Sequence, residues 1–224
     1  MPYYNITQTQ PLFGGFMRTT LLLIFFLLIV VGAMMMKAPS TTASTPLVKS
    51  THALPAALSH GVTRLNQLDC RQYSSQDECS TWSYSACSAA VMAEVLNAYG
   101  HHYRITDILR VEAALKRPTV ITPDQGLLYS GGIERTIHVF GFWTTWLKHP
   151  TVAQLVAVAA QAPVIVNFPP SRWTGGHFLI VTGGNVSHVF LVDSSRLNLR
   201  SMTIATFLTY WVGFAIVVSP KGGR

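Results

Sequence analysis

The 224-residue sequence predicts an α+β domain in which N-terminal helices pack on a C-terminal antiparallel sheet. Helical spacing of apolar residues dominates residues 87–161, whereas short β-branched stretches dominate residues 163–218. The composition agrees with this, because 49% of the residues are hydrophobic and only 11% are charged. Such a chain is long enough for one full-sized domain and too apolar for a disordered tail or a charge-rich coiled coil.

Apolar spacing and capping residues predict the helices. Residues 87–99 carry apolar side chains at i, i+3, i+4 and i+7 before a stop at Gly100, with Glu94 facing away from the core. Thr151 and Gln154 match a capping pattern that begins another helix, and Thr122 with the following Pro-Asp-Gln is interpreted as the start of a short one. Further helices are expected over residues 106–116, 132–140 and 204–211.

The predicted strands are short, rich in β-branched residues and bounded by Gly, Pro, Asn or Ser. They cover residues 163–168, 177–182, 188–192 and 213–218. The second and third would pair as a hairpin.

A single long apolar run lies near the N-terminus, where 18 uncharged residues separate Arg18 from Lys37. About 20 apolar residues span a bilayer as a helix, so the run predicts a transmembrane anchor over residues 19–37. We expect a short cytoplasmic segment at 1–18, a flexible linker at 38–61 and the folded domain at 62–220. This predicts a single-pass protein of the cell membrane with an extracytoplasmic domain. The alternative is a signal peptide cleaved near residues 31–33, which would release a secreted protein.

Charge and motifs exclude several classes of partner. The formal net charge of +7 falls to +4 from residue 50 onward, with 13 basic and 9 acidic residues and no basic stripe, so nucleic-acid binding is not expected. No HExxH motif, CxxC pair or glycine-rich phosphate loop is present. The sequence therefore implies no metal, nucleotide or other cofactor.

Three residues suit nucleophilic catalysis. Cys87 stands where a loop turns into a helix, and the unpaired N–H groups and dipole there favour a thiolate. His177 opens a strand directly after Gly175 and Gly176, and Asp193 ends the next strand. In a hairpin, His177 and Asp193 would lie at the same end of the sheet, where a carboxylate can orient an imidazole. His188 is the alternative base.

Two further cysteines, Cys70 and Cys79, are nine residues apart, and export would allow them to form a local disulfide. That pairing leaves Cys87 as the free thiol. A disulfide between Cys79 and Cys87 would instead remove the nucleophile.

These segments resemble the C39-like cysteine peptidase family, a branch of the papain-like fold. The resemblance covers about residues 65–220 and is carried by ACSAAVMAEVLNAYG at 86–100, APVIV at 162–166, GGHFLIVTG at 175–183 and the Asp that follows Val192. It implies that Cys87 is the nucleophile, His177 the general base and then acid, and Asp193 the residue that orients His177.

The resemblance also implies a glutamine that helps to hold the oxyanion. Thr81 occupies the position six before Cys87, so Gln76 is the candidate, with Gln72 as a substitute. Gln76 is expected to close a first strand. A second departure is Ser88, where many members carry Gly. Trp173 could wall a substrate groove near Gly175 and Gly176.

The leading hypothesis is an extracytoplasmic cysteine peptidase that cleaves peptide or protein amide bonds through a thioester. One alternative is a catalytically inactive domain that binds peptides or an envelope partner. Another is an amidase or acyltransferase acting on cell-wall or small-molecule amides.

Overall fold

One six-stranded antiparallel sheet organises the part of the chain that the computed structural model describes, residues 61–221. Its strands, in spatial order, are β3 (Phe142–Trp146), β8 (Ala215–Pro220), β4 (Val164–Phe168), β5 (His177–Gly184), β6 (His188–Val192) and β7 (Ser201–Thr203). Every neighbouring pair is antiparallel. The sheet and the helices that precede it confirm the α+β prediction.

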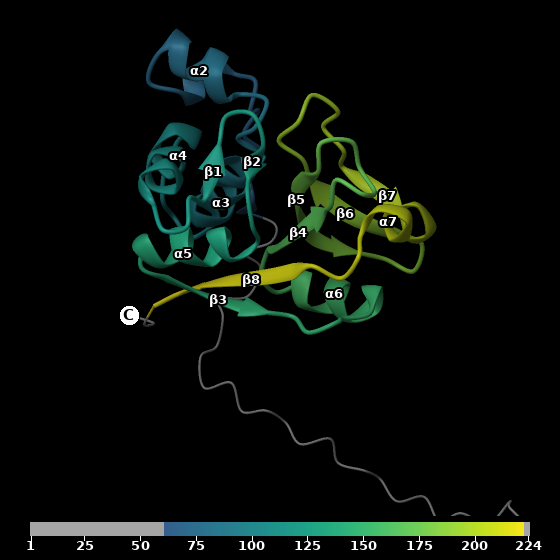
Figure 1. Cartoon of the computed structure of the whole chain (residues 1–224). Helices are drawn as coiled ribbons and strands as arrows, with labels where there is room; N and C mark the ends of the chain where they lie inside the picture. Colours follow the sequence, from purple (N-terminus) through teal and green to yellow (C-terminus); the bar gives the residue numbers. More distant parts are fainter. Residues whose placement is uncertain (1–60, 222–224) are drawn as a thin grey trace, which may run out of the picture. The chain divides into compact units, whose positions relative to one another are not determined.

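Helices lie on both sides of the sheet, with α3 and α5 on one side and α6 and α7 on the other (Figure 1). In chain order, the helical elements are the 3-10 turn η2 (Cys70–Gln72), α2 (Gln76–Trp82), α3 (Cys87–Ala98), α4 (Ile105–Ala114), α5 (Gly131–Val139), α6 (Val152–Ala159) and α7 (Ile204–Tyr210). The Thr151–Gln154 capping box predicted for α6 is confirmed.

Strand alternation builds two hydrophobic cores. In β4, Ile165 belongs to the core that contains α3, whereas its neighbours Val164 and Val166 belong to the core that contains α6 and α7. In β5, Ile180 belongs to the first of these cores and Leu179 to the second. Because successive side chains of a strand point to opposite faces, the continuous apolar runs of β4 and β5 supply both cores.

The sequence-based expectations for Thr122 and Glu94 are wrong. Thr122 does not begin a helix, because it ends β1 (Ile121–Thr122), which pairs with β2 (Gly126–Leu127). The Pro-Asp pair turns the chain here, and Gly126 has a φ of 67°, which favours a tight reversal. Strands β3 and β7 were not expected. Glu94 does not face outward, since it is fully buried within α3.

The predicted cytoplasmic segment and anchor, together with the linker up to residue 60, lie outside the described residues. Within residues 61–221, the helices are too short or too polar to cross a bilayer.

Close packing of α6 on the β5–β6 hairpin makes Gly184 intolerant of a side chain. A Cβ at Gly184 would lie 2.6 Å from the His188 carbonyl oxygen and 2.8 Å from a methyl group of Val156. We expect Gly184→Ala to lower the free energy of unfolding by about 1–3 kcal/mol, as overpacking does elsewhere. Urea denaturation measures this, with Gly61→Ala as the control because no atom lies within 4 Å of its added Cβ. Equal midpoints for the two variants would contradict this packing.

Candidate active site

Antiparallel pairing brings His177 and Asp193 to one end of the sheet. His177 is the first residue of β5, and Asp193 directly follows β6, whose last residue, Val192, lies opposite Ile180. The Nε2 atom of His177 is 2.7 Å from Oδ1 of Asp193. Because Nε2 is engaged with the carboxylate, Nδ1 is the ring nitrogen left to act on another group.

The Asp193 carboxylate is completely buried and fully hydrogen-bonded. Besides His177, Oδ1 accepts the N–H of Ser195 at 2.8 Å, and Oδ2 accepts the Ser195 hydroxyl and the Leu199 N–H, both at 2.9 Å. Burial alone would raise the pKa of Asp193, but these bonds stabilise the anion and lower the pKa to about 2. The carboxylate is therefore charged at neutral pH.

His177 is almost completely buried, which disfavours a charged ring. The hydrogen bond to Asp193 and the interaction with the Cys87 thiol outweigh that penalty and raise the pKa of His177 to about 9. The imidazole is therefore protonated over the neutral range.

Cys87 begins α3, which packs against β5, and it is the free cysteine among the described residues. Burial raises the pKa of its thiol, but the interaction with His177 and the nearby N–H groups of Phe178 and Ser88 lower it more, and the net shift is downward. No side chain caps α3 at Ala86, so its first N–H groups are available to an anion. The two pKa shifts thus favour a thiolate at Cys87 and an imidazolium at His177.

The other two cysteines, Cys70 and Cys79, are joined by a disulfide with an S–S distance of 2.05 Å.

Two completely buried carboxyl groups lie close to this site, and sequence reasoning identified neither. Glu112 of α4 accepts a hydrogen bond from the Ser88 hydroxyl at 2.9 Å, and Glu94 of α3 accepts the N–H of Leu65 at 2.7 Å. The second carboxyl oxygen of each has no hydrogen-bond partner. Burial raises the pKa of both groups to about 8. Both therefore keep a proton at neutral pH and add no negative charge near Cys87 and His177.

A signal for Glu94 was present in the sequence. Its position seven residues after Cys87 places both on the same face of a helix, so a Cys87 that faces the sheet implies that Glu94 faces inward as well. Glu112 lacked such a signal, because its partner Ser88 belongs to another helix.

Gln76 does not close a strand, contrary to expectation. Ser75 accepts the N–H of Glu78 and thereby caps α2, in which Gln76 is the first residue and is exposed. Gln72 is half-buried in η2. Among residues 61–221, no side-chain hydrogen bond joins either glutamine to Cys87 or His177.

Trp173 lies beside His177, with its ring 6.4 Å from the imidazole and nearly parallel to it. Gly175 and Gly176 adopt φ angles of 81° and 70° in the turn between Trp173 and His177, and Pro170 packs 3.1 Å from where a Gly176 Cβ would lie.

The alternative base, His188, begins β6, at the opposite end of that strand from Asp193, and its Nδ1 lies 2.8 Å from the Ser187 hydroxyl.

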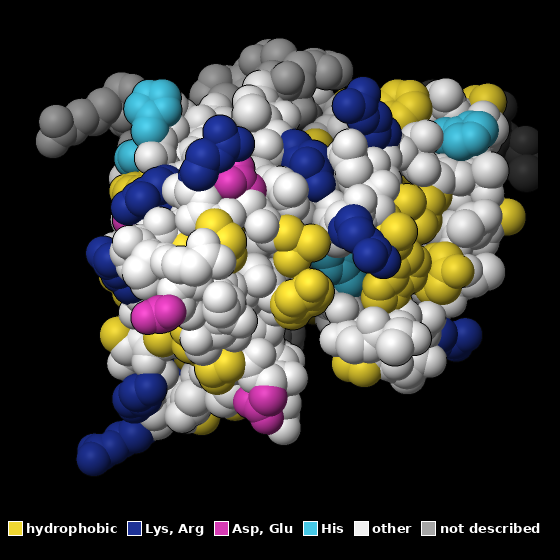
Figure 2. Space-filling model, turned by 90° about the horizontal axis from the view of Figure 1, so that it is seen from above, with side chains coloured by type: hydrophobic (Ala, Val, Ile, Leu, Met, Phe, Trp, Pro, Cys, Tyr) yellow, Lys and Arg dark blue, Asp and Glu magenta, His cyan; other side chains and the backbone are white. Residues whose placement is uncertain are grey.

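On the face that Figure 2 shows, hydrophobic side chains gather on both sides of a hollow between the helical part and the sheet.

Comparison with known proteins places this geometry in context. The model of the Peptidase C39 family matches residues 80–223. A search of curated proteins found no match.

Two C39 peptidase structures share the fold, and a third solved structure also matches. The peptidase domain of Streptococcus ComA, a bifunctional ABC transporter involved in quorum sensing, is similar with a TM-score of 0.51 and 24% identity over 61% of this chain and 93% of that one. A C39-like peptidase from Bacillus anthracis has a TM-score of 0.50 and 14% identity over 75% of this chain and 98% of that one. A double-glycine-motif protease from an AMS/PCAT transporter, in complex with a leader peptide, has a TM-score of 0.43 and 17% identity over 60% of this chain and 84% of that one.

The raised pKa of Glu112 predicts a stability that falls with pH. Between its ordinary pKa of 4.5 and about 8, the unfolded chain releases a proton that the folded protein keeps, so stability declines through this window and then levels. Glu112→Gln keeps the acceptor for Ser88 and removes the titration. We expect the stability of the variant relative to wild type to rise by a few kcal/mol from pH 5 to pH 8.

Urea denaturation at both pH values measures this difference. Glu134→Gln, which alters a half-buried carboxylate of α5, is the matched control. If Glu112→Gln retains the full decline of the wild type, then Glu112 is already ionised in the folded protein.

Proposed function

Because the chain belongs to the peptidase C39 family, we propose that its domain is a cysteine peptidase in which Cys87, His177 and Asp193 form the catalytic triad. The observation that carries this proposal is the buried imidazole held between a thiol and a carboxylate, with Asp193 2.7 Å from His177. The shifts of the three pKa values favour the charged form of each group. The substrate class is a peptide or protein amide, in line with the family.

In the proposed reaction, the Cys87 thiolate attacks the carbonyl carbon and forms a C–S bond, and the carbonyl π electrons move to oxygen. The backbone N–H groups at the start of α3 hold this oxyanion. We do not assign that role to Gln76, whose side chain is exposed on α2. The tetrahedral intermediate collapses as the C–N bond breaks, and the imidazolium of His177 gives its proton to the leaving amine.

The second half of the reaction returns the enzyme to its starting state. Neutral His177 takes a proton from water as the oxygen attacks the thioester carbonyl. The C–S bond then breaks, which releases the carboxylic product and leaves a thiolate beside an imidazolium. Throughout, Asp193 keeps its charge and holds the ring through Nε2.

The pH dependence of Cys87 alkylation tests the ion pair. In the full chain, iodoacetamide should label Cys87 well below pH 8.5, about the ordinary pKa of a thiol. His177→Ala should restore an ordinary thiol titration, whereas His188→Ala, the matched control, should behave as wild type. Mass spectrometry separates Cys87 from the two disulfide-bonded cysteines. Equal pH dependence of Cys87 labelling in wild type and in His177→Ala would refute the triad.

The same preparations test peptide cleavage. Peptide mixtures incubated with wild type should yield new termini, and Cys87→Ala should yield none. Activity should fall above pH about 9, where His177 loses the proton that the leaving amine needs. A reactive Cys87 without any cleavage would instead favour the peptide-binding alternative.

We also propose that the domain is extracytoplasmic and anchored by residues 19–37. The apolar run of the sequence supports the anchor, and the Cys70–Cys79 disulfide suits an oxidising compartment. A membrane-impermeant maleimide applied to intact cells should then label Cys87 before lysis. A reporter cysteine at the exposed Tyr84 serves as an accessible control. Labelling of both cysteines only after lysis would place the domain inside.

A further inference from the structure

Residues 64–67, which we call the strap, precede the region that the family model matches and hold the main chain around Asp193. The Nε and Nη2 groups of Arg64 donate to the carbonyl oxygens of Asp193 and Ser195, each at 2.6 Å. This is the two-pronged contact that a planar guanidinium makes well and a lysine does not. Arg64 therefore forms hydrogen bonds with the backbone on both sides of Ser194.

Gln67 connects the same loop to the segment that leads to Cys87. Its backbone N–H donates to the Ser194 carbonyl at 2.9 Å, and its side-chain Oε1 accepts the Ser194 hydroxyl at 2.9 Å. Its Nε2 donates to the carbonyl of Ser83, four residues before Cys87, at 2.9 Å. The Gln67 carbonyl accepts the Tyr73 hydroxyl at 2.6 Å. Gln67 is 6% exposed, so it joins the two loops inside the protein.

The strap also contacts the helix of the nucleophile, because the N–H of Leu65 donates to Glu94 of α3. Hydrogen bonds from Arg64, Leu65 and Gln67 thus reach the Asp193 loop, the helix that begins at Cys87 and the loop before it. The Cys87 helix and the Asp193 loop are far apart in the sequence, because Asp193 follows Cys87 by 106 positions.

We propose that the strap is a positioning element that holds the Asp193 loop against the Cys87 helix, so that Asp193 faces His177. The proposal rests on the proposed function. It deepens that function by assigning Arg64 and Gln67 a part in it without contact with substrate.

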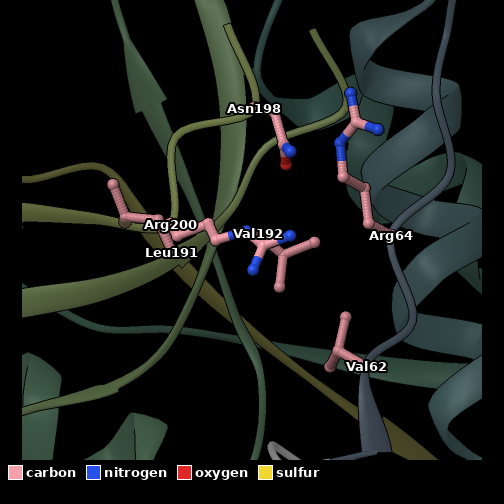
Figure 3. Close-up of a pocket in the computed structure, with 6 residues that line it drawn as sticks. All are labelled: Val62, Arg64, Leu191, Val192, Asn198 and Arg200. Carbon is pink, nitrogen blue, oxygen red and sulfur yellow. The ribbon is translucent and has the colours of Figure 1, made fainter.

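The surroundings of Arg64 supply a matched control. Arg64 and Arg200 line the same cavity of about 250 Å³, from the strap and from the segment before β7 respectively (Figure 3). Within residues 61–221, the Arg200 side chain makes no hydrogen bond. Arg64→Gln and Arg200→Gln therefore remove the same charge from one cavity, but only the first removes contacts with the Asp193 loop.

The experiment follows the ionisation of His177 and the reactivity of Cys87 in the full chain. In Arg64→Gln, we expect the His177 pKa, followed by NMR and assigned with His177→Ala, to move from about 9 toward 6.5. Alkylation of Cys87 at pH 6 should fall about tenfold, and kcat should fall by a similar factor at unchanged KM. Arg64→Lys should resemble Arg64→Gln, whereas Arg200→Gln should match wild type.

The NMR and alkylation readouts do not require peptidase activity, so an absence of cleavage would count against the proposed function and not against the strap. Equal His177 pKa values and Cys87 reactivity in Arg64→Gln and Arg200→Gln would overturn the strap proposal. If Arg64→Gln does not fold, Ser194→Ala removes a single bond to Gln67 and should shift the same two readouts in the same direction. A wild-type profile in that variant would then refute the proposal.

Discussion

A buried, charged imidazole requires a fixed negative charge beside it, and the hydrogen bond between His177 and Asp193 meets that requirement. Without the carboxylate, the largest contribution that favours the charged ring would be lost, and burial would lower the pKa of His177. The carboxylate is itself completely buried, so it needs the donors that Ser195 and Leu199 supply. The charge on His177 therefore depends on donors from the loop that follows β6.

The same constraint explains why the neighbouring acidic groups are neutral. A second full negative charge near Cys87 would raise the pKa of the thiol and weaken the ion pair. Glu94 and Glu112 avoid this because each is buried with one unpaired oxygen and keeps its proton. Keeping such groups protonated in the folded protein is the kind of stability–function compromise expected at a functional site.

Local sequence was sufficient to predict the fold class because the helices and strands near the site have unambiguous periods. The caps of α6 and the β-branched runs of β4 and β5 could be identified from a few consecutive residues each. The hairpin at Thr122 was missed because Pro-Asp after a Thr begins a helix or a turn equally well, and here a turn forms with Gly126 at a positive φ. Gln76 was misplaced because Ser75 caps a helix there.

The candidate residues Cys87, His177 and Asp193 could be proposed from sequence because each stands at the boundary of a predicted element. Arg64 and Gln67 could not, since their partners are mostly backbone carbonyls, and a carbonyl carries no sequence signature. Main-chain contacts of this kind bind whatever residue type the loop contains, and therefore they fix its position without constraining its sequence. In the proposed arrangement, a segment outside the family match positions the Asp193 carboxylate, and the boundaries of a family model then do not coincide with those of the site.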